Sequence, residues 1–458
     1  MKVQILAIGL TSLAMVGWGV GQECPEAALR EMVEKARREA MEKEKSADGN
    51  PADPAPAPAE PKADPPAQPG ARGSAASPVA PAMKTATVKR SKARVTGLLL
   101  RELTSSNFAA NASGLSAVAI PEERPPDKPL LSFNQPVGPL MAKALDEVRK
   151  LIAIRHGTWP AGQAVDLGFD EKYSPKDGPS AAVACALLLD SMIADYDIDP
   201  ALAVTGDVNA DGTVQAVGGV GDKVRAAVQR KCTIVAIPQA CETQVIDALV
   251  LNGPTLALQT QILTMKTFDQ AVSYGRVKRE PGVAEAMARF AALQTQLSSA
   301  GAPGPRLATG PVRAELQSIL QVLPEHLSAK LLLMIAERRL PGRLSTRGSL
   351  DVIDQRAGFI IEAVKKPAST DTLATDQLAN ALTRLREVRP LFDARILPYA
   401  DALANFGQMV REIRTRPAIR SVAEAERVRA RLMRAAEAVD TALSQIQTDR
   451  SLMEDADK

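Results

Sequence analysis

The 458-residue sequence has few aromatic residues, histidines and cysteines, and almost no excess charge of either sign. Aromatic residues make up 3% of the chain and hydrophobic residues 45%. A core must therefore be built from Ala, Val, Leu and Ile, a composition that favours helix-rich packing. The two histidines, His156 and His326, are too few for a multi-histidine metal site, and a Ser-His-Asp triad would have to recruit one of them.

The cysteines and the charges narrow the class of protein further. The four cysteines are too few and too irregularly spaced for a disulfide scaffold or a zinc site. The 56 Lys and Arg residues are interspersed with the 53 Asp and Glu residues. The sequence has no basic stripe with interleaved aromatic residues, so we expect no nucleic-acid partner. The sequence contains no G-x-x-x-x-G-K-[ST] phosphate loop. We expect neither a cofactor nor a metal.

The N-terminal residues indicate export. One lysine precedes an almost wholly apolar run and small residues that suit cleavage, which predicts a signal peptide over residues 1–22 and a periplasmic or secreted protein. The alternatives are an uncleaved membrane anchor through residues 3–20 or a buried first helix. Residues 23–45 have the spacing of a short amphipathic helix. Residues 46–88 are rich in Pro and Ala and predict a disordered linker.

Two folded regions are expected after the linker. Residues 89–278 alternate strand-like and helical patterns, which predicts one α/β (α+β) domain. Its expected strands are 94–103, 114–120, 164–169, 201–205, 213–217, 233–237 and 255–260. Its expected helices are 139–155, 179–194, 221–231 and 239–251. From 279 to 458 strand patterns vanish, which predicts an all-α domain with helices at 284–297, 312–322, 329–338, 350–363, 378–388, 398–413 and 423–445.

A serine stands at the predicted start of a buried helix. Gly178 permits a tight loop, Pro179 suits a first helical turn, and the residues after Ser180 are nearly all apolar. Unpaired N–H groups and the positive end of the helix dipole would surround a hydroxyl there, so it could attack a carbonyl with amides to stabilise the oxyanion. The loop alone favours the alternative that this serine only caps the helix.

A lysine stands near the start of a second predicted helix, after a glycine-rich bend at Gly218-Gly219. Desolvation and the helix dipole would both lower the pKa of Lys223, and a neutral amine could accept the proton of a serine. The alternative is an ordinary surface lysine.

The two stretches together resemble the proteolytic domain of the Lon protease family. Residues 175–181, Pro-Lys-Asp-Gly-Pro-Ser-Ala, match the serine signature of that family. Thr205-Gly206 matches a Thr-Gly-Glu strand end, and Gly218-Gly219 with Lys223 matches the lysine loop. The separation between Ser180 and Lys223 is also the one that the family pattern expects.

The resemblance implies a Lon-type proteolytic domain over residues 89–278 with a Ser-Lys dyad. Ser180 would be the nucleophile and Lys223 the general base. Thr205 would hydrogen-bond the lysine, Asp177 would be an acidic residue of the site loop, and Gly178 and Pro179 would form the oxyanion loop.

The sequence departs from the family pattern at several positions. Ala182 replaces a glycine, Asp207 replaces a glutamate, and Gly221-Asp222 replaces a Lys-Glu pair. The largest departure is that no ATPase module is recognisable.

The function expected from these observations is ATP-independent serine endopeptidase activity on polypeptides outside the cytoplasm. The alternative is a catalytically silent Lon-like protein that binds peptides or acts as a scaffold. The resemblance also leaves a homo-oligomer open.

Overall fold

A computed structural model describes residues 87–458, apart from 105–106, 121–130, 158–163, 172, 174–175, 299–303, 366–373, 416–420 and 457–458. The predicted signal peptide, the amphipathic helix and nearly all of the linker lie outside the described residues, as does Cys24. Along the described ranges, no helix is both long enough and apolar enough to cross a membrane.

The centre of the fold is a mixed seven-stranded sheet in the order β3-β4-β2-β1-β5-β8-β9. Its strands are β1 Lys92–Thr104, β2 Asn107–Ile120, β3 Leu131–Phe133, β4 Ala164–Phe169, β5 Leu202–Val204, β8 Ile234–Pro238 and β9 Gln261–Met265. β2 pairs antiparallel with β1 and β4, whereas β5, β8 and β9 continue the sheet parallel to β1. A separate two-stranded ribbon joins β6 Asp207–Val208 to β7 Val214–Gln215.

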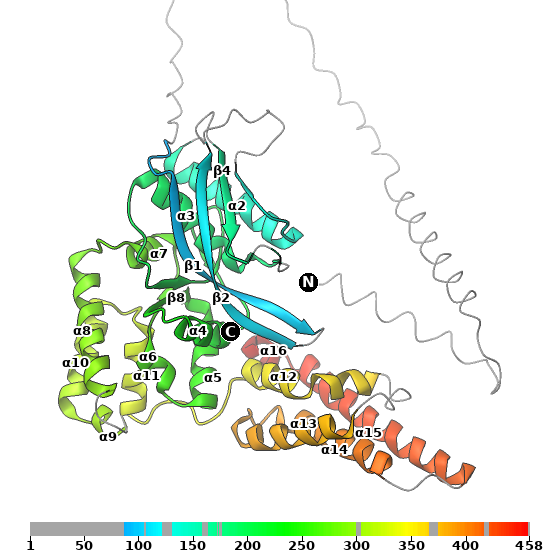
Figure 1. Ribbon diagram of the computed structural model, residues 1–458. Helices are drawn as coiled ribbons and strands as arrows, with labels where there is room; N and C mark the ends of the chain where they lie inside the picture. Colours follow the sequence, from blue (N-terminus) through cyan, green and yellow to red (C-terminus); the bar gives the residue numbers. More distant parts are fainter. Residues whose placement is uncertain are drawn as a thin grey trace, which may run out of the picture. The chain divides into compact units, whose positions relative to one another are not determined.

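The helices of the α/β part pack around this sheet. They are α2 Pro139–His156, η1 Pro179–Ala181, α3 Ala182–Ala194, α4 Val220–Gln229, η2 Gln239–Cys241, α5 Glu242–Asn252, α6 Thr255–Gln259 and α7 Phe268–Gly275. Every residue of α3 from Ala182 to Ile193 is buried, because this helix lies between α2 and the β1–β2 ribbon (Figure 1). The predicted α/β class is confirmed, and the buried α3 fixes the position of the turn that carries Ser180.

One stretch of the sequence-based prediction is wrong. Residues 255–260, expected as a strand, form α6, and the edge strand β9 follows them. Pro254 precedes α6 and is compatible with a first helical turn, so the apolar run at 255–265 divides into a short helix and a strand. The strands β3 and β6 and the helix α7 were not predicted.

The remaining helices are α8 Pro281–Ser298, α9 Gly304–Leu307, α10 Gly310–Val322, α11 Leu327–Ala336, α12 Thr346–Lys365, α13 Thr375–Val388, η4 Arg389–Leu391, α14 Leu397–Thr415, α15 Val422–Thr448 and α16 Arg450–Ala456. The expectation of helices after the α/β region is confirmed. However, α8 to α11 share the hydrophobic core of the sheet. A second core begins at Leu344 and includes α12 to α15. Hydrophobic packing therefore changes partners near residue 340, well after the boundary expected at 279.

Candidate active site

The turn that carries Ser180 is held by its neighbours in sequence and in space. Gly178 has φ +95°, a conformation that side chains other than glycine rarely adopt, and Pro179 opens η1. The Ser180 carbonyl oxygen accepts the N–H of Gly206 at 3.0 Å and the hydroxyl of Thr205 at 3.2 Å. These bonds tie the serine turn to the end of β5, and the Ser180 side chain is left half-buried.

Asp177 is a positioning residue of the same loop. Its Oδ1 accepts the N–H of Met141 at 3.1 Å, in the first turn of α2, and the N–H of Gly178 at 2.8 Å. The carboxylate thus satisfies a donor at the positive end of α2 and fixes the backbone two residues before Ser180. A side chain at Gly138 would collide with it, because an added Cβ would lie 2.2 Å from Asp177 Cγ.

The N–H groups near Ser180 are not equally available for an oxyanion. Gly178 N–H already donates to Asp177, and Pro179 has no N–H. Ala182 N–H donates to Pro179 O within the turn. Ser180 lies in the first turn of η1, where N–H groups have no acceptor within the helix. Its N–H also has no backbone partner elsewhere among the described residues. It is therefore a donor at this turn that a developing oxyanion could use.

Lys223 is the most deeply buried lysine that the structure describes. It is 1% exposed and lies in the first turns of α4, where its N–H donates to Gly219 O at 3.0 Å. Desolvation lowers the pKa of Lys223 to about 8, and the nearby Cys241 opposes this shift only in part. The amine does not point into bulk water, and a large fraction of it is neutral in mildly alkaline solution.

The bend before Lys223 is fixed by the start of α5. Gln244 accepts the N–H of Val220 at 2.9 Å through Oε1 and donates to Val217 O at 3.1 Å through Nε2. The Cys241 thiol lies 3.4 Å from both N and O of Val217. Neither Gln244 nor Cys241 was singled out from the sequence, because only the fold brings them to the glycine-rich bend.

The serine turn and the lysine bend are linked through β1. Thr205 is fully buried, and its hydroxyl lies 3.3 Å from Leu98 O in β1 as well as 3.2 Å from Ser180 O. Farther along β1, Leu100 lies against Gly219, where an added Cβ would come within 2.8 Å of Leu100 Cδ2. The Thr205 hydroxyl thus bonds two backbone carbonyls, and within the described residues no hydrogen bond joins it to Lys223.

The Ser180 hydroxyl and the Lys223 amine also have no hydrogen bond to each other in the described part of the chain. Neither group forms a hydrogen bond or an ion pair with another described side chain, so both remain available to react or to bind a substrate. The dyad itself stays a prediction.

Neither histidine lies at this site. His156 Nε2 lies 2.7 Å from Asp190 Oδ1, near the far end of α3 and about 15 Å along the helix from Ser180. His326 is fully buried, and desolvation lowers its pKa to about 3. Across the described ranges, no group of three His, Cys, Asp or Glu side chains could hold a metal ion. The described cysteines Cys185, Cys232 and Cys241 are buried free thiols.

The chain is similar to known proteins in the region that holds these residues. Residues 161–268 match the family described as Lon protease (S16) C-terminal proteolytic domain. An archaeal Lon protease from Methanocaldococcus jannaschii is 29% identical over 164 residues, which are 34% of this chain and 24% of that protein. The Lon protease of Chloroherpeton thalassium is 38% identical over 79 residues, 17% of this chain and 9% of its own length.

The Lon protease of Clostridioides difficile is 41% identical over 78 residues, which are 17% of this chain and 10% of that protein. The chain thus spans between 9% and 24% of the length of these three relatives. The family match at residues 161–268 covers the serine turn and the lysine bend.

Proposed function

We propose, from the premise that this chain contains a Lon-family proteolytic domain, that it is a serine peptidase in which Ser180 is the nucleophile and Lys223 the general base. The observation that carries this proposal is a lysine 1% exposed, with a pKa lowered by desolvation to about 8, in the same domain as a serine at the start of a buried helix. A buried amine with no carboxylate partner among the described residues is costly, and a role in catalysis would account for its presence.

The reaction proceeds through an acyl-enzyme. Neutral Lys223 accepts the proton of the Ser180 hydroxyl as Oγ bonds to the scissile carbonyl carbon, and the Ser180 N–H donates to the oxyanion. The C–N bond then breaks, and the Lys223 ammonium returns its proton to the departing amine. Water attacks the ester and Lys223 takes a proton from that water. The C–O bond then breaks, and the Lys223 ammonium gives this proton to Ser180 Oγ, which restores the hydroxyl and the neutral amine.

The substrates in this proposal are polypeptides, and cleavage requires no ATP. The absence of a Walker A motif from the 458 residues supports ATP independence. An enzyme that works without a motor would act on extended segments, exposed loops and peptides. The apolar residues 3–20 support a location outside the cytoplasm.

Cleavage of casein and of quenched peptides by the purified chain tests the activity. We expect ATP-independent cleavage, a loss of about 10²–10⁴-fold in kcat/KM for Lys223→Ala, and a loss at least as large for Ser180→Ala. Lys143→Ala, an exposed lysine on α2, is the matched control and should leave the rate unchanged. A boronate or fluorophosphonate probe should label wild type at Ser180.

Two outcomes would overturn the proposal. Cleavage that survives in Ser180→Ala would mean another nucleophile or a contaminant. A well-folded wild-type chain that binds peptides but neither cleaves them nor reacts with the probe would support the alternative of a silent peptide-binding protein.

A further inference from the structure

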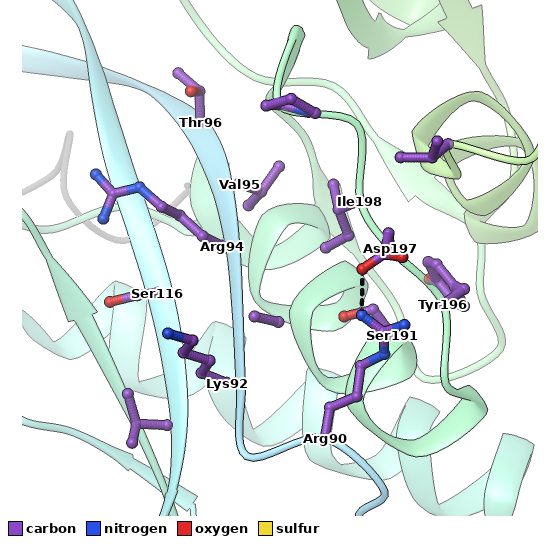
Figure 2. A pocket seen from close by; sticks show the side chains of 14 residues that line it. Arg90, Lys92, Arg94, Val95, Thr96, Ser116, Ser191, Tyr196, Asp197 and Ile198 are labelled. Atoms are coloured by element: carbon purple, nitrogen blue, oxygen red, sulfur yellow. Dashed lines mark hydrogen bonds and ion pairs between the residues drawn. The ribbon is translucent and has the colours of Figure 1, made fainter.

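We propose that polypeptide substrates dock an extended acidic segment as an added strand in a slot between β1 and the α3–β5 connection, remote from Ser180. The slot is a cavity of about 690 Å³. Its walls come from the first half of β1, from Ser116 and Val118 of β2, and from residues 196–198 and Pro200 (Figure 2). This docking proposal depends on the proposed peptidase activity in one respect only, which is that the bound peptide is called a substrate.

The slot exists because the sheet is incomplete beside β1. β2 pairs with β1 from Lys92 onward, but β5 pairs with β1 only at Thr96 and Gly97. On the β5 side, the stretch from Lys92 to Val95 therefore has no neighbouring strand. β5 closes one end of the slot. At the other end, Arg90 forms an ion pair with Asp197 across the gap (Figure 2).

The backbone groups of β1 that face the slot follow from strand parity. Ser91 O accepts the N–H of Ala119 of β2 at 2.8 Å, whereas Leu98 O accepts the Thr205 hydroxyl on the opposite side. Because successive residues of a strand point their N–H and C=O groups to alternate sides, Lys92 and Arg94 direct theirs away from β2 and into the slot. No backbone partner for either residue is found on that side in the described chain.

The opposite wall presents a matching edge. Ile198 forms an antiparallel bridge with Arg276, made by the bonds from Asp199 N to Gly275 O and from Val277 N to Asp197 O. In such a bridge the flanking residues make the hydrogen bonds, so the N–H and C=O of Ile198 point to the other side, toward β1. One extended segment would thus find unpaired backbone groups on both sides and complete the sheet.

The two faces of the slot favour different side chains in a bound segment. Figure 2 shows Lys92 and Arg94 on one side of the β1 ribbon and Val95 and Ser191 on the other. The side chain of Lys92 is exposed and makes no ion pair within the described residues. Val95 is buried, and Ile198 and Tyr196 line the same apolar side. A segment in which acidic residues alternate with apolar ones fits both faces.

The slot is distinct from the proposed catalytic site. Ser191, which lines the slot, and Ser180 lie on one helical stretch, about 16 Å apart along its axis. An acidic segment several residues away from the scissile bond could occupy the slot while another part of the substrate reaches Ser180. The gain would come from effective concentration, which lowers KM and leaves kcat unchanged.

Direct binding tests the proposal without requiring turnover. The probe is a fluorescein-labelled heptapeptide of alternating Glu and Val, titrated into the full chain carrying Ser180→Ala and followed by anisotropy. We expect saturable binding that weakens at least threefold in Lys92→Glu and is unchanged in Lys143→Glu, an exposed lysine outside the slot. A probe N-methylated at its central residue should bind at least fivefold more weakly, because it cannot donate to the wall.

Hydrogen exchange and kinetics complete the test. Added probe should slow amide exchange at Lys92, Arg94 and Ile198. In the wild-type chain, a quenched peptide joined by a Gly-Ser linker to the Glu-Val segment should have a lower KM than one joined to a Lys-Val segment. Equal binding of the N-methylated probe, equal effects of Lys92→Glu and Lys143→Glu, or no binding up to millimolar probe would overturn the docking proposal.

The two proposals can fail separately. Probe binding in a chain that cleaves no peptide would leave the slot as a peptide site and overturn the peptidase proposal. Cleavage of peptides without probe binding would overturn the docking proposal and leave the peptidase proposal standing.

Discussion

Lys223 carries a cost in folding stability that depends on pH. The pKa of its amine is about 8 in the folded chain against an ordinary value of 10.5, because burial disfavours the charged form. Below pH 8 the folded state must hold a buried ammonium, so the full penalty applies there. The penalty falls as pH rises from 8 to 10.5, where the unfolded chain also loses the proton.

Lys223→Met should therefore stabilise the protein. At 1.36 kcal/mol per pKa unit, the gain in unfolding free energy is about 3 kcal/mol at pH 7 and roughly half of that at pH 9.5. Urea unfolding of the variant and the wild type at the two pH values measures it. Lys92→Met, at an exposed position, is the control and should change little. A Lys223→Met chain less stable than wild type at pH 7 would contradict the desolvated amine.

The same amine sets the expected pH dependence of cleavage. If neutral Lys223 is the base, kcat/KM should rise about tenfold per pH unit below pH 8 and level off above it. No histidine limb is expected, because His326 is buried away from this site and His156 contacts Asp190. Initial rates on a quenched peptide from pH 6 to pH 10 give the profile. A rate that is flat from neutral to alkaline pH would argue against Lys223 as the base.

At the scale of elements, Asp177 couples the first turn of α2 to the serine turn. Removing its carboxylate leaves the Met141 and Gly178 N–H groups without their acceptor. Asp177→Ala should lower the free energy of unfolding by about 1 kcal/mol, as expected for a lost helix cap. It should also lower kcat more than it raises KM, because the serine turn loses its fixed position.

The matched control is Asp146→Ala, a carboxylate on α2. Asp146 pairs with Arg149 on the surface at 3.0 Å, and such pairs contribute little. Thermal unfolding and steady-state kinetics of both variants separate the two roles. Equal effects of the two substitutions would show that Asp177 has no special part in positioning Ser180.

Elements with strong local signals could be predicted from the sequence. The helix over 139–155 and the strand over 164–169 appear within one residue of their predicted bounds. The run at 255–265 could not be divided correctly, because a short apolar stretch fits a strand and a buried helix equally well. β9 belongs to the sheet because it pairs in parallel with β8, and an isolated bridge joins Leu263 on its other edge to His326, far along the chain.

The residues of the candidate site fall into two groups, those that a local motif indicates and those that only the fold brings to the site. Ser180 and Lys223 stand in two local motifs that together resemble those of the Lon family, so the sequence could single them out as candidates. Gln244 and Cys241, which hold the lysine bend, have no such motif, and the carbonyl of Leu98 carries no side-chain signal at all. These contacts arise from tertiary packing, which a single sequence does not display.

At the scale of the whole chain, the core of the sheet depends on helices beyond the predicted α/β boundary. Residues 325–328 complete the outer edge of β9. Thr264 N–H donates to Glu325 O at 2.9 Å, and the buried Ser328 hydroxyl accepts the N–H of Ile262 at 2.8 Å and donates to Thr260 O at 2.9 Å. α8 and α11 add Phe290 and Leu332, both fully buried, to the same core.

Truncation separates the two alternatives for where the first folded region ends. A chain of residues 79–340 keeps the cover of β9 and should unfold cooperatively. A chain of residues 79–278 would expose β9 as a bare apolar edge and leave buried groups such as Thr260 O and Gln261 without their partners, so it should aggregate or fail to fold. Circular dichroism melts and size-exclusion chromatography compare the two. A soluble, cooperative 79–278 chain would show instead that α8 to α11 are dispensable for the fold of the sheet.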